Sequence, residues 1–368
     1  MTSKLYASEK ITFDSIQLLR FLAALMVVIC HSSFYAFERL NKEAYVYGEG
    51  AHGVSLFFVI SGFVMVVSSQ KLIGVKNSWK EFAVKRIVRI VPIYWIMTTF
   101  KLVVMIMAAS LVYHSKLDVI AILKSYFFIP GLNAEQEFRP IYGVGWTLNF
   151  EMFFYILFCV SLFIRVKPLL FLSTIFVPLA LLSFFRTSNW SDLSFYTDSI
   201  VLNFLYGMIA GQLILKRIRL PFIISIVAII LSLLYIFIPR YGFFSGLVGT
   251  DKLIVGILCF FVIWCAASIE PLIKDKIPNW SLYLGGASYS IYLIHPTVSP
   301  IAPTLLYRIG VNYSMLSVVI SVTISLASGA LFYKYCETPL TKFLSRKFNY
   351  NSNKIAKEAL VDSAVVKL

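Results

Sequence analysis

The sequence predicts an all-α integral membrane protein, built as a polytopic bundle of about ten transmembrane helices. Of its 368 residues, 59% are hydrophobic and only 14% are charged, and the mean hydropathy is +0.81. The apolar residues fall in blocks close to the roughly 20 residues that span a bilayer. Because backbone amides in lipid must pair within the chain, we expect these blocks to be helices.

The apolar blocks define the expected spans in order along the chain. Most blocks are separated by polar or basic segments, whereas the fourth and fifth are divided only by the short basic turn 165–168. The expected spans are 15–36, 53–69, 89–112, 142–164, 168–185, 197–215, 221–238, 250–268, 283–306 and 313–335.

The net charge of +15 follows the expected topology. Most of the 33 lysine and arginine residues lie in the N-terminal segment, in four alternate connections and in the C-terminal tail, all on one side of the predicted bundle. Such an excess marks the cytoplasmic side, so we expect both termini in the cytoplasm. The even number of spans agrees, and no nucleic-acid partner is needed to explain the charge.

One membrane domain is expected over residues 1–341, followed by a polar, basic cytoplasmic tail over 342–368. The five cysteines lie in or at the ends of apolar blocks without the spacing of metal ligands, so we expect small buried side chains and no metal. The first apolar run is long and follows a polar segment, so we expect no cleavable signal peptide. P-loop, GxSxG, HExxH and CxxC motifs are all missing.

Arg20 and His31 both lie within the first apolar run, LLRFLAALMVVICHSSF. An ionisable residue at membrane depth is costly and usually marks a functional site. At roughly 100° and 1.5 Å per residue, His31 returns to within about 20° of Arg20 and lies about 16 Å further along the same face. A lone histidine can also simply bond to a neighbouring helix. Because the two residues share a helix face, we favour a functional role for both: Arg20 as a cation that meets an anionic donor at one level, and His31 as a general base at the other.

Arg86 and Arg89 lie three positions apart in KEFAVKRIVRIVPIYW, at the expected cytoplasmic entry to the third span. Their side chains are therefore neighbours on one helix. They fit either ordinary snorkelling to the membrane surface or a guanidinium pair that binds phosphate. Pro92 is expected to bend this helix near its start.

Glu151 lies inside the fourth expected span, in GWTLNFEMFFYILF, and a carboxylate there needs a partner. A structural ion pair, for example with Lys101, and a catalytic role beside His31 both fit this position. Trp146 fits an interfacial belt or a pocket wall. His295 precedes Pro296 in SYSIYLIHP and fits structure and function equally. Trp146, His295 and Ser61 are the further candidates for the pocket.

Taken together, these motifs resemble the acyltransferase-3 family of bacterial membrane O-acyltransferases. The resemblance covers nearly the whole transmembrane chain and rests on their order and spacing. The motifs are SIQLLRFLAALMVVICH, GVSLFFVISGFVM, KRIVRIVPIYW, GWTLNFEMFFY and SYSIYLIHP. The stretch WTLNFEMFFY most resembles the exopolysaccharide O-acetyltransferase branch of this family.

The resemblance implies transfer of an acyl group, usually acetyl, from cytoplasmic acyl-CoA to a sugar hydroxyl of an envelope glycan or its lipid-linked precursor. It implies that His31 is the essential histidine, Arg20 its basic partner, and Arg86 with Arg89 the pair that serves the CoA phosphates. Glu151 matches the family's acidic position. Acetyl-CoA would be a donor substrate, and no permanently bound cofactor is expected. The resemblance also implies a multi-pass protein of the bacterial inner membrane.

Two positions depart from the pattern of many relatives, namely Ser55 in place of an aspartate and Met152 in place of a second acid. No fused extracytoplasmic esterase-like domain is visible, so the chain is expected to recognise its acceptor with its own outer loops. The mechanistic hypothesis makes His31 the general base, with Glu151 orienting its ring. An acyl-histidine intermediate is the alternative.

Two rival functions use the same residues. In a transporter or flippase for lipid-linked sugars, the buried ionisable groups would form a proton or substrate path. The helices show no evident inverted repeat, which disfavours this alternative. In a non-catalytic assembly subunit, the arginine pair would only snorkel and His31 would only pack.

Overall fold

The computed structural model describes residues 13–108, 117–133, 135–186, 190, 192–238 and 248–348. These residues form helices joined by turns and loops, with a single isolated bridge between Leu132 and Phe138 in place of any strand. Among them, seven helices are long and apolar enough to cross a membrane, and Ser199–Leu215 and Phe222–Phe237 are shorter apolar helices. The all-α polytopic class is therefore confirmed, with fewer long spans than the ten apolar blocks suggest.

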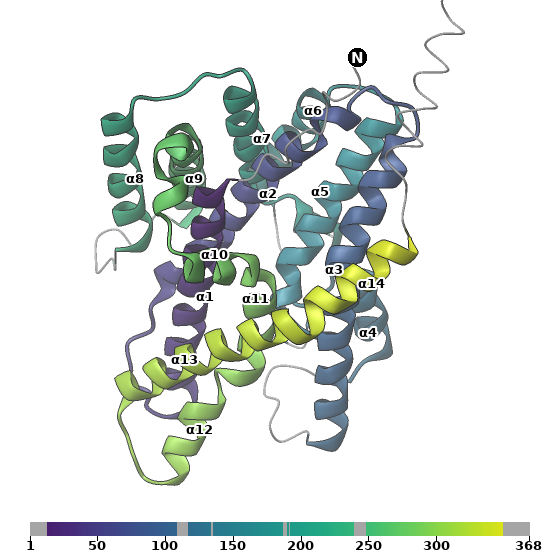
Figure 1. The fold of residues 1–368 in the computed structure, drawn as a ribbon. Helices are drawn as coiled ribbons and strands as arrows, with labels where there is room; N and C mark the ends of the chain where they lie inside the picture. Colours follow the sequence, from purple (N-terminus) through teal and green to yellow (C-terminus); the bar gives the residue numbers. More distant parts are fainter. Residues whose placement is uncertain are drawn as a thin grey trace, which may run out of the picture.

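The helices follow the apolar blocks in order (Figure 1). Their bounds are α1 Asp14–Arg39, α2 Gly53–Ser69, α3 Ser78–Met107, α4 Val119–Tyr126, α5 Trp146–Phe163, α6 Pro168–Leu182, α7 Leu202–Leu215, α8 Phe222–Phe237, α9 Val248–Ile273, α10 Asn279–Gly286, α11 Ser288–Val298, α12 Ile301–Arg308, α13 Ser314–Phe332 and α14 Thr338–Lys347, with a π-helical turn at Tyr333–Glu337.

Helix α3 begins eleven residues earlier than expected, at Ser78 instead of 89. The expected start of the third span at residue 89 therefore lies inside a longer helix. Arg86 and Arg89 lie in its third and fourth turns, about 12 and 17 Å from its start at 1.5 Å per residue. The helix also continues through Pro92, which lies near its middle. The buried side chains of Ser78, Glu81 and others in its first turns show that packing against the bundle extends the helix beyond its apolar block.

The expected span 283–306 was wrong as a single helix, because three helices, α10, α11 and α12, occupy this region. Glycine is a poor helix former, and α10 ends at the pair Gly285–Gly286. A Cβ at Gly285 would overlap the backbone oxygen of Gln17, so this glycine also lets α10 approach α1 closely. Pro300 separates α11 from α12. As a result α11 is a short, separately oriented helix beside α1.

The largest core cluster joins α2, α3, α5, α6 and α7 and is strongly aromatic. The ring of Phe204 on α7 stacks on Phe58 of α2 and on Phe154 of α5, with centroid distances of 4.6 and 4.4 Å. Two glycines let α2 and α7 touch, since a Cβ at Gly62 or Gly207 would overlap backbone atoms of the facing helix. Small residues at such crossings are typical of membrane helix packing. This packing holds α2 firmly in the centre of the bundle.

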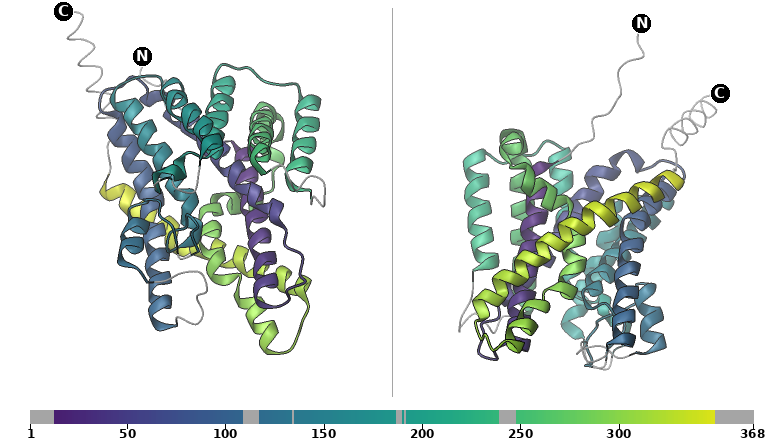
Figure 2. Two further views of the ribbon diagram at one scale, coloured as in Figure 1. Left: turned by 180° about the vertical axis from the view of Figure 1, so that it is seen from behind. Right: turned by 60° about the horizontal axis from the view of Figure 1, so that its bottom comes forward.

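Helices α13 and α14 form one long diagonal across the front of the molecule, from α12 to α3 (Figure 1). Figure 2 shows the same crossing from a second direction. The π-helical turn lies where the two helices join. The diagonal therefore links the region around α1 with the region around α3.

The first turn of α1 is anchored by a carboxylate from α9. The backbone N–H groups of Asp14 and Ser15 donate to Glu270 Oε1 and Oε2 at 2.6 and 3.0 Å. A negative charge is favourable at a helix N-terminus, where four backbone N–H groups have no partner within the helix.

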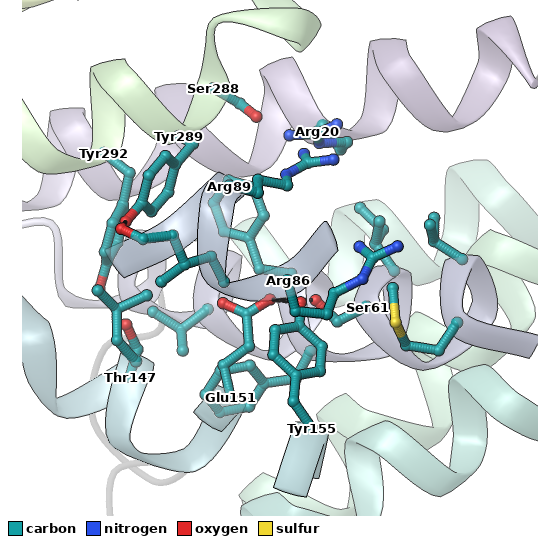
Figure 3. Close-up of a pocket in the computed structure, with 18 residues that line it drawn as sticks. Arg20, Ser61, Arg86, Arg89, Thr147, Glu151, Tyr155, Ser288, Tyr289 and Tyr292 are labelled. Atoms are coloured by element: carbon teal, nitrogen blue, oxygen red, sulfur yellow. Dashed lines mark hydrogen bonds between the residues drawn. The ribbon is translucent and has the colours of Figure 1, made fainter. Parts of the chain in front are cut away.

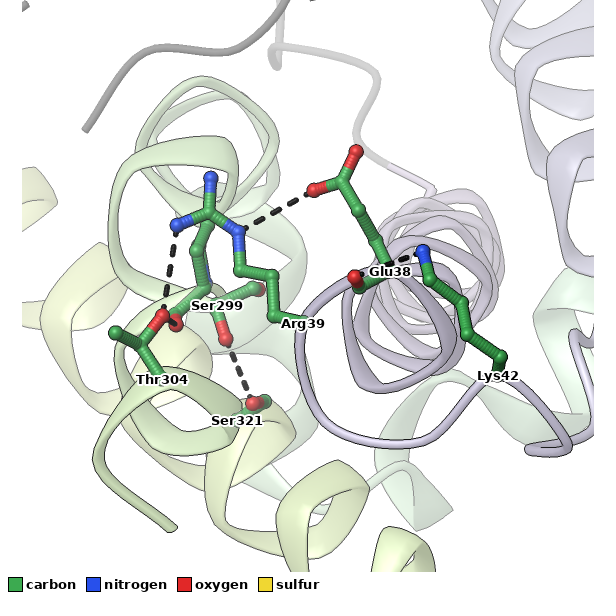
Figure 4. Close-up of polar contacts among 7 residues, drawn as sticks. Glu38, Arg39, Lys42, Ser299, Thr304 and Ser321 are labelled. Atoms are coloured by element: carbon green, nitrogen blue, oxygen red, sulfur yellow. Dashed lines mark hydrogen bonds and ion pairs between the residues drawn. The ribbon is translucent and has the colours of Figure 1, made fainter. Parts of the chain in front are cut away.

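The last turn of α1 is held by α12 (Figure 4). Arg39 donates to Glu38 at 3.2 Å and to Thr304 Oγ1 at 3.4 Å. Ser321 of α13 donates to the Ser299 carbonyl at 2.8 Å and ties the neighbouring turn into the same group. Both ends of α1 are therefore fixed against other elements, and so is the height of every side chain between them.

Candidate functional site

A cavity of about 100 Å³ lies between α1, α2, α3, α5 and α11, and it collects charged side chains from three of these helices, α1, α3 and α5. Figure 3 shows the guanidinium groups of Arg20 and Arg89 pointing toward one another across it. The polar residues at the cavity are Arg20, Ser61, Arg86, Arg89, Thr147, Glu151, Tyr155, Ser288, Tyr289 and Tyr292. We call this cavity the arginine pocket. It brings together five of the residues singled out in the sequence, from segments far apart in the chain.

Glu151 accepts hydrogen bonds from α2 and from its own helix. Ser61 Oγ donates to Glu151 Oε1 at 2.9 Å, and the Tyr155 hydroxyl donates to the same oxygen. The two partners come from α2 and α5 and bind the same oxygen, so the orientation of the carboxylate is well defined. Glu151 therefore belongs to the arginine pocket, and the described contacts give it no bond to His31.

Arg86 lies over the rings of Phe82 and Tyr155, with its guanidinium carbon 5.6 and 5.8 Å from their centroids. Aromatic faces attract cations, particularly where water is excluded. Its Nε atom is buried and has no hydrogen-bond partner in the structure. A buried donor of this kind costs free energy unless a ligand or water satisfies it. Arg86 is therefore presented to the cavity as a cation with unused hydrogen-bonding capacity.

His31 makes its side-chain contact outside the arginine pocket, with His295 of α11. His31 Nδ1 and His295 Nε2 are 3.0 Å apart, and the two rings lie 4.9 Å apart between centroids. The other nitrogen of His295, Nδ1, faces the Ile291 carbonyl at 3.3 Å, and the whole residue is buried. We call these two residues the histidine pair.

The geometry selects the tautomers of a neutral histidine pair. A carbonyl can only accept, so His295 Nδ1 carries the proton and its Nε2 becomes an acceptor. His31 Nδ1 must then donate to His295 Nε2. This leaves His31 Nε2 with a free lone pair, the form that a general base requires.

Tyr292 connects the histidine pair to the arginine pocket. Its side chain lines the pocket, and its ring centroid lies 5.7 Å from that of His295. Its hydroxyl is 2.9 Å from Thr147 Oγ1 and donates to the Val144 carbonyl at 3.1 Å. One turn of α11 thus reaches from the cavity to the histidines.

Trp146 and Lys101 lie outside this arrangement. Trp146 begins α5 and packs edge-on against Phe150, with 6.1 Å between ring centroids, and it does not line the arginine pocket. Lys101 lies twelve residues beyond Arg89 on α3, about 18 Å along the helix. The suggested Lys101–Glu151 salt bridge was wrong, because Glu151 is bonded to Ser61 and Tyr155.

Several residues of the site were missed in the sequence, namely Thr147, Tyr155, Ser288, Tyr289 and Tyr292. Thr147 and Tyr155 had a usable signal, because they lie four positions before and after Glu151 and so share its helix face. The others depend on how α11 packs against α5, which no local pattern indicates.

The chain matches the family model described as an acyltransferase domain over residues 13–334. It is 32% identical over 315 residues to the exopolysaccharide production protein ExoZ of Rhizobium meliloti, covering 83% of this chain and 94% of that protein. It is 24% identical over 373 residues to a putative O-acetyltransferase of Staphylococcus aureus, covering 92% of this chain and 58% of that protein. No solved structure matches the chain.

Proposed function

The chain belongs to the acyltransferase family whose model it matches and is a multi-pass membrane O-acyltransferase, and from this premise we propose that it moves an acetyl or other short acyl group from cytoplasmic acyl-CoA to a sugar hydroxyl. The acceptor we propose is an envelope or extracellular polysaccharide or its lipid-linked precursor. The similarity to an exopolysaccharide production protein supports this class of acceptor.

The observation that carries the proposal is the meeting of Arg20, Arg86 and Arg89 at one cavity in the membrane-spanning part of the chain. Buried cations are expensive, and three together favour an anionic ligand. Arginine suits phosphate, because its planar fork donates two parallel hydrogen bonds. The cavity is narrow, so we propose that it holds the phosphopantetheine arm of the donor, with the phosphates at the guanidinium groups.

His31 is the proposed general base. Its Nε2 takes the proton of the sugar hydroxyl, and the oxygen attacks the thioester carbonyl carbon. The C–S bond then breaks, and the CoA thiolate leaves and takes up a proton. His295 holds the His31 ring in the reactive tautomer through the 3.0 Å contact. In this proposal it takes the orienting role first considered for Glu151.

Glu151 receives a different role in the proposal. With Ser61 and Tyr155 it forms a fixed, hydrogen-bonded carboxylate beside Arg86. It balances part of the positive charge of the arginine pocket and keeps the guanidinium groups in place when no donor is bound. An acyl-histidine intermediate on His31 is compatible with the same geometry, in which case the base acts first as a nucleophile.

The charge distribution supports an inner-membrane protein with both termini in the cytoplasm. In this orientation α1 runs from the cytoplasm outward, and Arg20 precedes His31 along the path of the donor. The distance between them along the helix is about 16 Å at 1.5 Å per residue. A pantetheine arm is a flexible chain suited to such a span, so the nucleotide can stay on the cytoplasmic side while the thioester reaches the outer half.

The test uses a strain that lacks the gene for this chain, complemented with wild type or with His31→Ala. ¹H NMR of the purified surface polysaccharide measures its O-acetyl content, and immunoblots of membranes check that both proteins are present equally. The proposal predicts that acetyl signals return only with wild type. Equal restoration by both would show that His31 is structural. No change with either would show that the acceptor is not this polysaccharide.

A further inference from the structure

Glu337 is a buried carboxylate to which the proposed reaction assigns no task. It is the last residue of the π-helical turn Tyr333–Glu337 and is only 7% exposed. Ser290 of α11 donates a hydrogen bond to its Oε2. π-Helical turns are rare, and inside longer helices they are frequently found at functional sites. Here the turn brings the carboxylate into contact with α11.

The position of Glu337 places it behind the arginine pocket. Ser290 follows Ser288 and Tyr289, which both line the pocket. Ser288 and Tyr289 line that cavity together with Arg20 and Arg89, and Glu337 is bonded to the next residue of α11, so the carboxylate lies just behind a wall that faces both arginines. Its charge attracts both guanidinium groups. Among the described residues, no ion pair at contact distance joins Glu337 to either arginine, so the interaction acts across a gap.

The charges around the pocket do not cancel. Three cations, Arg20, Arg86 and Arg89, face two carboxylates, Glu151 and Glu337. Arg20 and Arg89 also lie close enough to repel one another. Like charges buried together are stable only where opposite charges lie nearby. Glu151 is bonded to groups of α2 and α5, on the side of Arg86, whereas Glu337 is bonded to α11, behind the part of the cavity wall formed by Ser288 and Tyr289.

We propose that Glu337 is the counter-ion of Arg20 and Arg89. Before the donor binds, its charge holds these two cations side by side in the pocket. When the donor binds, the carboxylate competes with the donor phosphates for the two arginines. The inference rests on the proposed function, in which those phosphates bind at the arginines. Glu337 is in this sense a positioning residue. It limits the affinity for the donor, so that the CoA product is released after transfer.

The test measures CoA binding and the thermal unfolding midpoint of the full-length protein in lipid nanodiscs, with CoA itself as the probe. Glu337→Gln keeps the shape and the acceptor for Ser290 but removes the charge. Without CoA, the unfolding midpoint of Glu337→Gln should be lower than that of wild type. The variant should bind CoA on the order of tenfold more tightly, so that CoA raises its midpoint by more than it raises the wild-type midpoint. Ser290→Ala is the matched control, because it removes the hydrogen bond, keeps the charge and should leave CoA affinity as in wild type.

Weaker or unchanged CoA affinity in Glu337→Gln would overturn the proposal and leave Glu337 a packing residue. A second comparison separates this failure from a failure of the proposed function. If CoA does not bind wild type at all, the donor site is wrong. The double variant Arg20→Gln with Glu337→Gln still decides the counter-ion role: a midpoint above that of Glu337→Gln alone supports it, and a midpoint equal to or below that value contradicts it.

Discussion

The arginine pocket and the histidine pair lie at two levels of the same helix, α1, yet they differ in the charge and packing of their side chains. The pocket is a cavity lined by charged side chains from three helices, and part of its hydrogen-bonding capacity is unused. The histidine pair is closely packed, and its described bonds go to neutral groups. A cavity rich in fixed cations is suited to binding an anion, whereas a neutral, oriented imidazole is suited to moving a proton. The difference suggests that binding and chemistry are separated along α1.

Replacing His31 gives the largest expected effect on this comparison. His31→Ala should lower kcat by about 100- to 10,000-fold, because a positioned general base is lost. The affinity for acetyl-CoA should stay near wild type, since His31 is remote from the arginines. Release of CoA thiol by the purified protein in nanodiscs, with acceptor polysaccharide present, measures kcat. A fall in donor affinity as large as the fall in kcat would show that the two regions are one site.

Replacing His295 should have the next largest effect, although in our scheme it touches no substrate. His295→Phe keeps the ring volume but removes the acceptor for His31 Nδ1. Loss of a partner that orients a metal-bound histidine typically costs about 10- to 100-fold, and by analogy we expect a fall of this size in kcat. His295→Gln should recover part of the activity, because an amide oxygen can accept the same hydrogen bond. His52→Gln, at a histidine outside the pair, is the control. Equal activity of wild type and His295→Phe would contradict the tautomer assignment.

Replacing Arg86 should have the opposite pattern to replacing His31: it should change KM for the donor and leave kcat nearly unchanged. Arg86→Gln should raise KM for acetyl-CoA by about tenfold or more, because one charge-assisted hydrogen bond to phosphate contributes roughly 1.5–3 kcal/mol. The value of kcat at saturating donor should change little. The exposed cation Lys80, in the first turn of the same helix, offers the matched control Lys80→Gln. A variant with normal KM would remove Arg86 from the donor site.

Removing the hydroxyl of Tyr292 should have the smallest effect. Tyr292→Phe keeps the ring between the pocket and His295 and loses only the bonds to Thr147 and Val144. A neutral hydrogen bond contributes about 1 kcal/mol, so we expect a change of a few-fold in kcat and a small drop in the unfolding midpoint. A loss as large as that of His31→Ala would give the hydroxyl a direct part in the chemistry.

The sequence predicted the class of fold well but not its interruptions. Hydropathy alone located the apolar blocks. They were expected to be helical because backbone N–H and C=O groups in lipid must form hydrogen bonds within the chain. The break at Gly285–Gly286 was missed because a continuous apolar run hides it, and close contact with the Gln17 backbone stabilises it only in the folded bundle. The early start of α3 was missed because its first turns are polar and form a helix through tertiary packing.

The candidate site divides in the same way. Arg20, His31 and Glu151 were predictable because ionisable side chains are rare at membrane depth. Their pairing was not, although Ser61 and His295 were among the candidates, because the contact between His31 and His295 joins positions 264 residues apart. Glu337 was missed for another reason. Its sequence, YKYCETPL, resembles an ordinary helix end, and only the π-helical turn and its contact with Ser290 reveal its place.

The most direct test of separation along α1 is a cryo-EM structure of the protein in nanodiscs with a non-hydrolysable thioether analogue of acetyl-CoA. The account predicts phosphates within hydrogen-bonding distance of Arg86 and Arg89, and the analogue's carbonyl within reach of a hydroxyl held at His31 Nε2. Phosphates bound elsewhere, or an acyl end pointing away from His31, would contradict it.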